Sequence, residues 1–134
     1  MRSIKFERID GGKYKYRLLE QYEHPTLLPE VPGNHYVGIE MHGDLLISEG
    51  YCWDGASGPT IDTPATMRGS LVHDAMYQLL REGYLPQAYR SYADRLLRDV
   101  CIEDGMDPFR ATIWYWAVRA FARGAAKKEV MAMT

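Results

Sequence analysis

The segment Leu71-Val72-His73-Asp74-Ala75-Met76-Tyr77 places a His-Asp pair inside an otherwise apolar run with helical periodicity. An imidazole beside a carboxylate in such a helix costs free energy unless the two groups are paired or used. Two other segments carry residues that can complete a site with this pair: the glycine-rich segment 50–59 (GYCWDGASGP) and the segment 92–97 (YADRLL). We therefore expect these three segments to meet in the folded chain.

Length and composition indicate a single domain with a packed core. The 134 residues fit one domain, and 46% hydrophobic against 25% charged residues argues against disorder. The formal net charge is −2, without a block of like charges, which argues against a dedicated nucleic-acid binder because such a protein needs a basic face for the phosphates.

Neither a membrane span nor a signal peptide is expected. No apolar run approaches the ~20 residues that span a bilayer, and the N-terminus is charged and alternating, unlike a secretory signal. A reducing cytoplasm is therefore expected. There Cys52 and Cys101 are most simply reduced core residues, with a disulfide between them as the second alternative.

The first 50 residues show the alternation of short strands. Residues 3–9 and 13–19 flank an Asp-Gly-Gly turn and predict a hairpin, and residues 35–41 and 45–48 predict a second one. The prolines within 21–34 predict a connecting loop or edge segment, whose histidines we assign no role. We expect one small antiparallel sheet of about four strands.

Three helices are predicted after the glycine-rich loop. The first spans about 63–81, with a threonine cap, a proline in its first turn and a glycine stop; the second spans about 86–103. The third runs from Pro108 to about Gly124, or on to 129, and is apolar on most sides, which predicts burial between other elements or against a partner.

The fold class is thus α+β: a small N-terminal antiparallel sheet followed by three C-terminal helices. The whole chain, 1–134, is expected to form a single domain. Its parts are a β part (1–50), a glycine-rich loop (51–62) and a helical part (63–129).

Spacing predicts a contact between His73 and Asp94. The first two helices are joined by about five residues, so they should be antiparallel neighbours, and the two side chains should lie at similar heights on them. Asp94 can then orient the imidazole for proton transfer. Tyr77 shares the stripe of His73 and is placed with them in the candidate catalytic set, although a packing role with a hydroxyl bond to Asp94 is the simpler alternative.

Asp74 points about a quarter-turn away from His73, so the two side chains can line different sides of one cavity. This predicts that the Asp74 carboxylate binds a cation. Carboxylates and backbone oxygens are ligands of hard cations such as calcium. The candidate metal ligands are Asp74, Asp54 and the backbone of Trp53 and Gly55 in the glycine-rich loop. The same loop can instead offer amides to an oxyanion. In the structural alternative, Asp74 pairs with Arg81 or Arg68, and the His73–Asp94 bond has no substrate.

These segments resemble the DUF1353 family, whose uncharacterised members occur mostly in tailed bacteriophages and prophages. The matching residues are Gly50-Tyr51-Cys52-Trp53-Asp54-Gly55-Ala56-Ser57, His73-Asp74-Ala75-Met76-Tyr77 and Ala93-Asp94-Arg95-Leu96. The resemblance spans roughly residues 34–122. It implies a phage protein located in the host cytoplasm after synthesis, or in the virion.

The site is also similar, more distantly, to that of phospholipases A2. There a His-Asp-x-x-Tyr helix faces a second helix bearing an aspartate, and a glycine-rich loop helps to hold calcium. The likeness implies that His73 activates water, that Asp94 orients His73, and that Asp74 with loop carbonyls binds Ca²⁺.

Two hypotheses follow. The first is a metal-assisted hydrolase of an ester, with a lipid as the implied substrate. The second is a non-enzymatic phage structural, tail or assembly protein, in which His73, Asp74 and Asp94 pin the helices together and the third helix docks other phage proteins.

Overall fold

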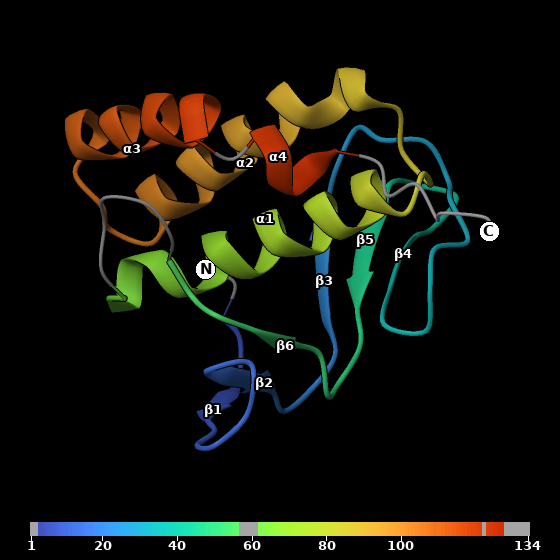
Figure 1. Cartoon of the computed structure of the whole chain (residues 1–134), viewed down its shortest axis with the longest axis horizontal. Helices are drawn as coiled ribbons and strands as arrows, with labels where there is room; N and C mark the ends of the chain where they lie inside the picture. Colours follow the sequence, from blue (N-terminus) through green and yellow to red (C-terminus); the bar gives the residue numbers. More distant parts are fainter. Residues whose placement is uncertain (1–2, 57–61, 122, 128–134) are drawn as a thin grey trace, which may run out of the picture.

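The computed structural model confirms the α+β fold (Figure 1). It describes residues 3–56, 62–121 and 123–127. Helix α1 (Pro64–Arg81) lies between the other helices and the strands, and it supplies much of the core. Its side chains at Leu71, Ala75 and Leu79 are fully buried. The segment that carries His73 is therefore the central element of the molecule.

The first sheet has the strand order β1-β2-β6. Strands β1 (Phe6–Arg8) and β2 (Tyr16–Leu18) form the first predicted hairpin, with Phe6 opposite Leu18. Strand β6 (Cys52–Trp53) extends it by pairing Trp53 with Tyr16. This strand lies in the segment that we predicted as glycine-rich loop, because two residues are too few to show alternation.

The second sheet has the order β3-β5-β4. Strands β4 (Val37–Ile39) and β5 (Asp44–Ile47) form the second predicted hairpin. Strand β3 (Tyr22–Pro25) lies in the proline-containing segment expected as a loop or edge. The expected single sheet is therefore two sheets of three strands, joined by the chain rather than by a shared strand ladder.

Local signals placed the helices well. Helix α1 begins after Thr63, whose backbone N–H donates to Thr66 Oγ1 at 2.9 Å, and Gly83 follows it with φ of 80°. A short 3₁₀ turn, Gln87–Tyr89, precedes α2 (Arg90–Glu103), so the regular helix starts slightly later than predicted. Helix α3 spans Pro108–Phe121, and a short α4 spans Arg123–Ala126.

The third helix is buried on one face only, which contradicts the expectation of burial between other elements of the chain; burial against a partner stays a prediction. Ala111, Trp114 and Val118 are buried and share a cluster with Leu97 of α2. The opposite side of α3 carries large apolar side chains that are exposed. No helix among the described residues is long and apolar enough to cross a membrane.

The two cysteines are both free thiols, which excludes the disulfide alternative. Cys101 is fully buried on α2, opposite Gly69 of α1, where a Cβ would come within 2.6 Å of its sulfur. Gly69 therefore permits α1 and α2 to approach closely, just one turn before His73.

Candidate functional site

Asp94 is the centre of the polar cluster between the helices. Its side chain on α2 is fully buried, and its Oδ1 accepts hydrogen bonds from His73 Nε2 at 2.7 Å and Tyr77 Oη at 2.6 Å. The rings of His73 and Tyr77 lie 4.1 Å apart between centroids. The predicted matching of heights on α1 and α2 is thus confirmed, as is the predicted bond from the Tyr77 hydroxyl.

The bond to Asp94 also defines which nitrogen of His73 is basic. A carboxylate only accepts hydrogen bonds, so Nε2 carries the proton that it donates. In the neutral ring Nδ1 is then the unprotonated nitrogen. His73 itself is 5% exposed. The imidazole is therefore held in one tautomer, with its free lone pair on the side away from Asp94.

Two arginines that we did not predict bind the other oxygen of Asp94. Arg119 of α3 donates from Nη1 to Oδ2 at 2.9 Å, and Arg90 places its Nη1 3.8 Å from the same oxygen. The spacing of Arg90 and Asp94, four residues apart on a helix, was a usable signal. Arg119 lies 25 residues further along the chain and gave none.

The environment keeps Asp94 ionised. Burial by itself would raise the pKa of its carboxyl, but the hydrogen bonds from His73 and Tyr77 and the contact with Arg119 outweigh this and hold the pKa below its usual value. In the reverse direction, burial and the bond to Asp94 raise the pKa of the Tyr77 phenol. Tyr77 is thus a hydrogen-bond donor and not a base.

The charge of Asp54 acts on Asp74. Burial and the charge of Asp54 raise the pKa of Asp74 to about 7, although the nearby charge of Arg81 lowers it to a smaller extent. Arg68 is not its partner: the Arg68 guanidinium bonds Asp104 at 2.9 and 3.0 Å and the Tyr22 hydroxyl at 2.9 Å. The alternative pairing of Asp74 with Arg68 is therefore wrong.

The ligands available near Asp74 fit a hard cation in type. Two carboxylates that repel each other are relieved by a divalent ion, and backbone oxygens can complete its shell. The described residues contain no group of three or more His, Cys, Asp or Glu side chains arranged to hold a metal. Calcium at this place would thus depend on carbonyl and water oxygens beyond Asp74 and Asp54.

Asp62 organises the glycine-rich loop, and sequence reasoning missed it. Its Oδ1 accepts from the Ala56 backbone N–H at 2.7 Å, and its Oδ2 accepts from the Tyr16 hydroxyl at 2.5 Å. Gly55, with φ of 78°, lies against this carboxylate. The indole of Trp53 is buried and donates to Ser70 of α1 at 3.1 Å, so its side chain has a structural role. Ser57 and Gly58 lie outside the described residues.

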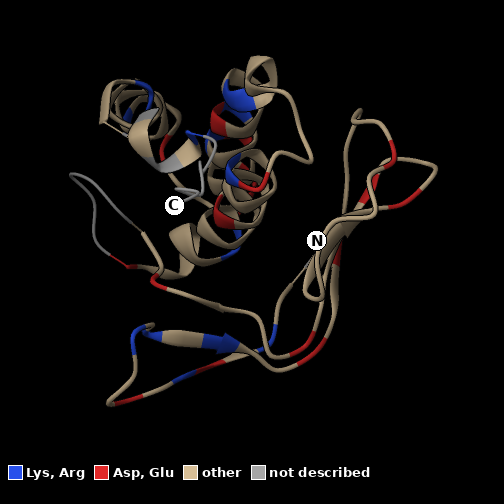
Figure 2. Ribbon diagram, turned by 45° about the vertical axis from the view of Figure 1, so that its right-hand side comes forward, with Lys and Arg blue, Asp and Glu red and all other residues tan. Residues whose placement is uncertain are grey.

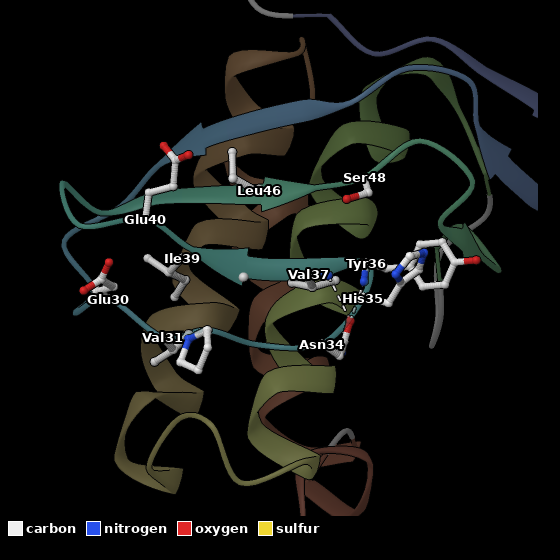
Figure 3. A pocket seen from close by; sticks show the side chains of 12 residues that line it. Glu30, Val31, Asn34, His35, Tyr36, Val37, Ile39, Glu40, Leu46 and Ser48 are labelled. Carbon is white, nitrogen blue, oxygen red and sulfur yellow. Dashed lines mark hydrogen bonds between the residues drawn. The ribbon is translucent and has the colours of Figure 1, made fainter.

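Two surface hollows lie away from His73. One, of about 510 Å³, lies on the face of β4 and β5 that is turned away from the helices (Figure 3). The other, of about 550 Å³, is bounded by residues such as Phe6, Tyr16 and Met67. Since neither is lined by His73, they are not parts of the candidate site.

No protein-family model, curated protein or solved structure matches this chain. The likenesses to the DUF1353 family and to phospholipases A2 stay predictions.

Proposed function

We propose that this chain hydrolyses ester bonds, with His73 as the general base and Asp94 as the residue that positions it. The observation that carries the proposal is the 2.7 Å bond from His73 Nε2 to Asp94 Oδ1, which leaves Nδ1 to accept a proton. A base held in one tautomer by a buried carboxylate is the arrangement that water activation requires.

The proton inventory of the reaction is simple. His73 Nδ1 takes a proton from water as the water oxygen attacks the ester carbonyl, and the ring becomes an imidazolium. Its charge is stabilised by Asp94, which remains ionised. The imidazolium then returns the proton to the departing alcohol as the tetrahedral intermediate collapses, so that the base is regenerated.

Calcium is proposed as the electrophile, on the likeness to phospholipases A2. Asp74 and Asp54 would hold the ion together with the backbone oxygens of Trp53 and Gly55. A bound Ca²⁺ supplies polarisation of the ester carbonyl and stabilisation of the negative charge that develops on its oxygen. The repulsion between Asp54 and Asp74 supports this assignment. A lipid ester is the substrate class proposed.

A second function is favoured by a different observation. Asp94 receives bonds from His73 and Tyr77 of α1 and from Arg119 of α3, so one carboxylate links three helices. Such a cluster serves equally well as a structural clamp in a phage tail or assembly protein. In that case, the imidazole of His73 is one more hydrogen-bond donor, and the protein catalyses no hydrolysis.

The test is ester hydrolysis by wild-type protein and His73→Gln, with and without calcium. Gln keeps a donor near the Nε2 position, so the bond to Asp94 and the fold should survive, while the base is lost. We expect hydrolysis of dihexanoyl phosphatidylcholine in Ca²⁺, a loss of activity in EDTA, and a fall in kcat of about 10²- to 10⁴-fold in His73→Gln.

The exposed His42 provides the matched control. His42→Gln should leave both the melting temperature and kcat unchanged. If the wild type cleaves no ester with Ca²⁺, or if His73→Gln is as active as His42→Gln, His73 is not a catalytic base. A large drop in melting temperature for Asp94→Asn together with no wild-type activity would favour the structural clamp.

A further inference from the structure

One face of α3 is an exposed apolar stripe. Phe109, Ile113 and Trp116 follow one another at spacings of four and three residues, which places them on the same side of the helix. They are 75%, 52% and 64% exposed, and Phe121 at the helix end is 79% exposed. The helix lies on the outside of the helical layer (Figure 1). Large apolar side chains gathered on one surface mark an interaction site.

The charged residues of α3 itself are all basic. Residues 108–127 contain four basic residues but neither Asp nor Glu. Of the two on α3, Arg110 is exposed, whereas Arg119 pairs with Asp94 at 2.9 Å. The nearest carboxylate in sequence, Asp107, is engaged as the cap of α3 and accepts from the Arg110 backbone N–H at 3.1 Å. The stripe therefore suits a surface with anionic groups on the outside and an apolar layer beneath them.

The opposite charge dominates the β3-β5-β4 sheet. Residues 18–67 contain neither Lys nor Arg, and Figure 2 shows acidic residues without basic ones along these strands. Their carboxylates include Glu23, Glu30, Glu40 and Asp44. An anionic surface would repel this sheet and attract α3, so the charge distribution also sets an orientation.

The size of the stripe favours a lipid surface over a protein partner. A helix of 14 residues is about 21 Å long, and a face about 10 Å wide then offers roughly 200 Å². Stable protein interfaces need about 800 Å² on each partner. Binding of a helix to a membrane surface instead increases gradually with the apolar area buried and with the electrostatic attraction to anionic lipids, so a small face still contributes.

We infer that α3 is a membrane-docking surface that binds anionic lipid bilayers peripherally. Phe109, Ile113 and Trp116 enter the boundary between headgroups and acyl chains, and Arg110 remains among the phosphates. This inference goes beyond the proposed hydrolase function and is independent of it, since the stripe binds lipid whether or not His73 is a base.

The experiment uses vesicles of phosphatidylglycerol and phosphatidylcholine at equal parts, with phosphatidylcholine alone for comparison. Trp53 and Trp114 are 1% and 3% exposed, whereas Trp116 is 64% exposed, so a blue shift of tryptophan emission on binding reports Trp116. We expect this shift and co-sedimentation with the anionic vesicles, weakened by high salt. Trp116→Ala should weaken partitioning about tenfold and Arg110→Gln about fivefold.

Ile113→Glu is the decisive variant, and Leu27→Glu is its matched control. Leu27 is 92% exposed in the acidic half of the chain, so the same substitution there adds the same charge without touching the stripe. Ile113→Glu should weaken vesicle binding about a hundredfold, because it places a carboxylate among the acyl chains and next to anionic headgroups. Leu27→Glu should leave binding unchanged.

The inference is overturned if the wild type does not bind the anionic vesicles at low salt, or if Ile113→Glu and Leu27→Glu bind equally. It is also overturned if sedimentation velocity shows a dimer that Ile113→Glu dissociates and no vesicle binding, since α3 would then be a protein interface. His73→Gln should bind vesicles as the wild type does, which separates this result from the hydrolysis test.

Discussion

Replacing Asp74 by Asn should stabilise the calcium-free protein, and more so as the pH rises. The carboxyl of Asp74 is half-buried on α1 beside the charge of Asp54, and its pKa is raised from 3.8 to about 7. The folded chain therefore holds a proton there that the unfolded chain has already lost at neutral pH. Folding is penalised whenever this carboxyl must ionise.

The sign and size of the effect follow from linkage. A raised folded-state pKa costs nothing below pH 3.8, costs progressively more between 3.8 and 7, and has a constant cost above 7. A shift from 3.8 to about 7 corresponds to at most about 4 kcal/mol, and water reaching the half-buried carboxylate reduces this to about 2–4 kcal/mol. For a domain of this size that is roughly 8–16 °C in melting temperature.

Thermal melts in EDTA at pH 4 and pH 8 provide the measurement. Asp74→Asn should melt close to the wild type at pH 4 and well above it at pH 8. Asp10→Asn is the control, because the Asp10 side chain is 96% exposed and its replacement should have no pH-dependent effect. A difference between Asp74→Asn and wild type that stays constant from pH 4 to 8 would refute the assignment. Calcium should raise the wild-type melting temperature at pH 8 and leave that of Asp74→Asn unchanged.

Two further predictions concern the contacts that support the site. Asp104→Ala removes the bidentate partner of the buried Arg68 and should lower the free energy of unfolding, measured by chemical denaturation, by about 2–3 kcal/mol. Asp99→Ala, which breaks the exposed pair with Arg98, should lower it by less than about 0.5 kcal/mol. Equal losses would contradict the stabilising role of the Arg68–Asp104 pair. Gly55→Ala and Gly11→Ala both place a Cβ at positive φ, but only at Gly55 would the Cβ meet the Asp62 carboxylate, at 2.4 Å. Gly55→Ala should therefore lower the free energy of unfolding by about 1–3 kcal/mol more than Gly11→Ala in the same assay. Similar losses would show that Asp62 does not restrain the loop.

The helical half and the His73–Asp94 contact could be predicted because their signals are local. The cap at Thr63, the stop at Gly83 and the restart at Asp107-Pro108 depend on a few neighbouring residues. A short connection then makes two helices antiparallel, and counting residues along each helix matches the heights of His73 and Asp94. Each step uses the fixed geometry of a helix.

The missed features depend on contacts that helix and strand periods do not encode. Strand β6 has two residues, and its pairing of Trp53 with Tyr16 joins positions far apart in the chain. Arg119 reaches Asp94 only because α3 packs on α2 at one particular rotation. The same rotation leaves Trp116 exposed while Trp114 is buried, although both are equally apolar in the sequence.

The arginines at Asp94 bear directly on the choice between enzyme and clamp. In a His-Asp pair, the carboxylate assists catalysis partly by orienting the ring and partly by stabilising the imidazolium. Arg119 at 2.9 Å and Arg90 at 3.8 Å already balance much of the charge on Asp94, so the second contribution is weakened while the first is strengthened. Calcium near Asp74 would then have to supply more of the stabilisation of the transition state. A hydrolase built this way should depend steeply on the metal and only modestly on the charge of Asp94, whereas a clamp should depend on Asp94 alone.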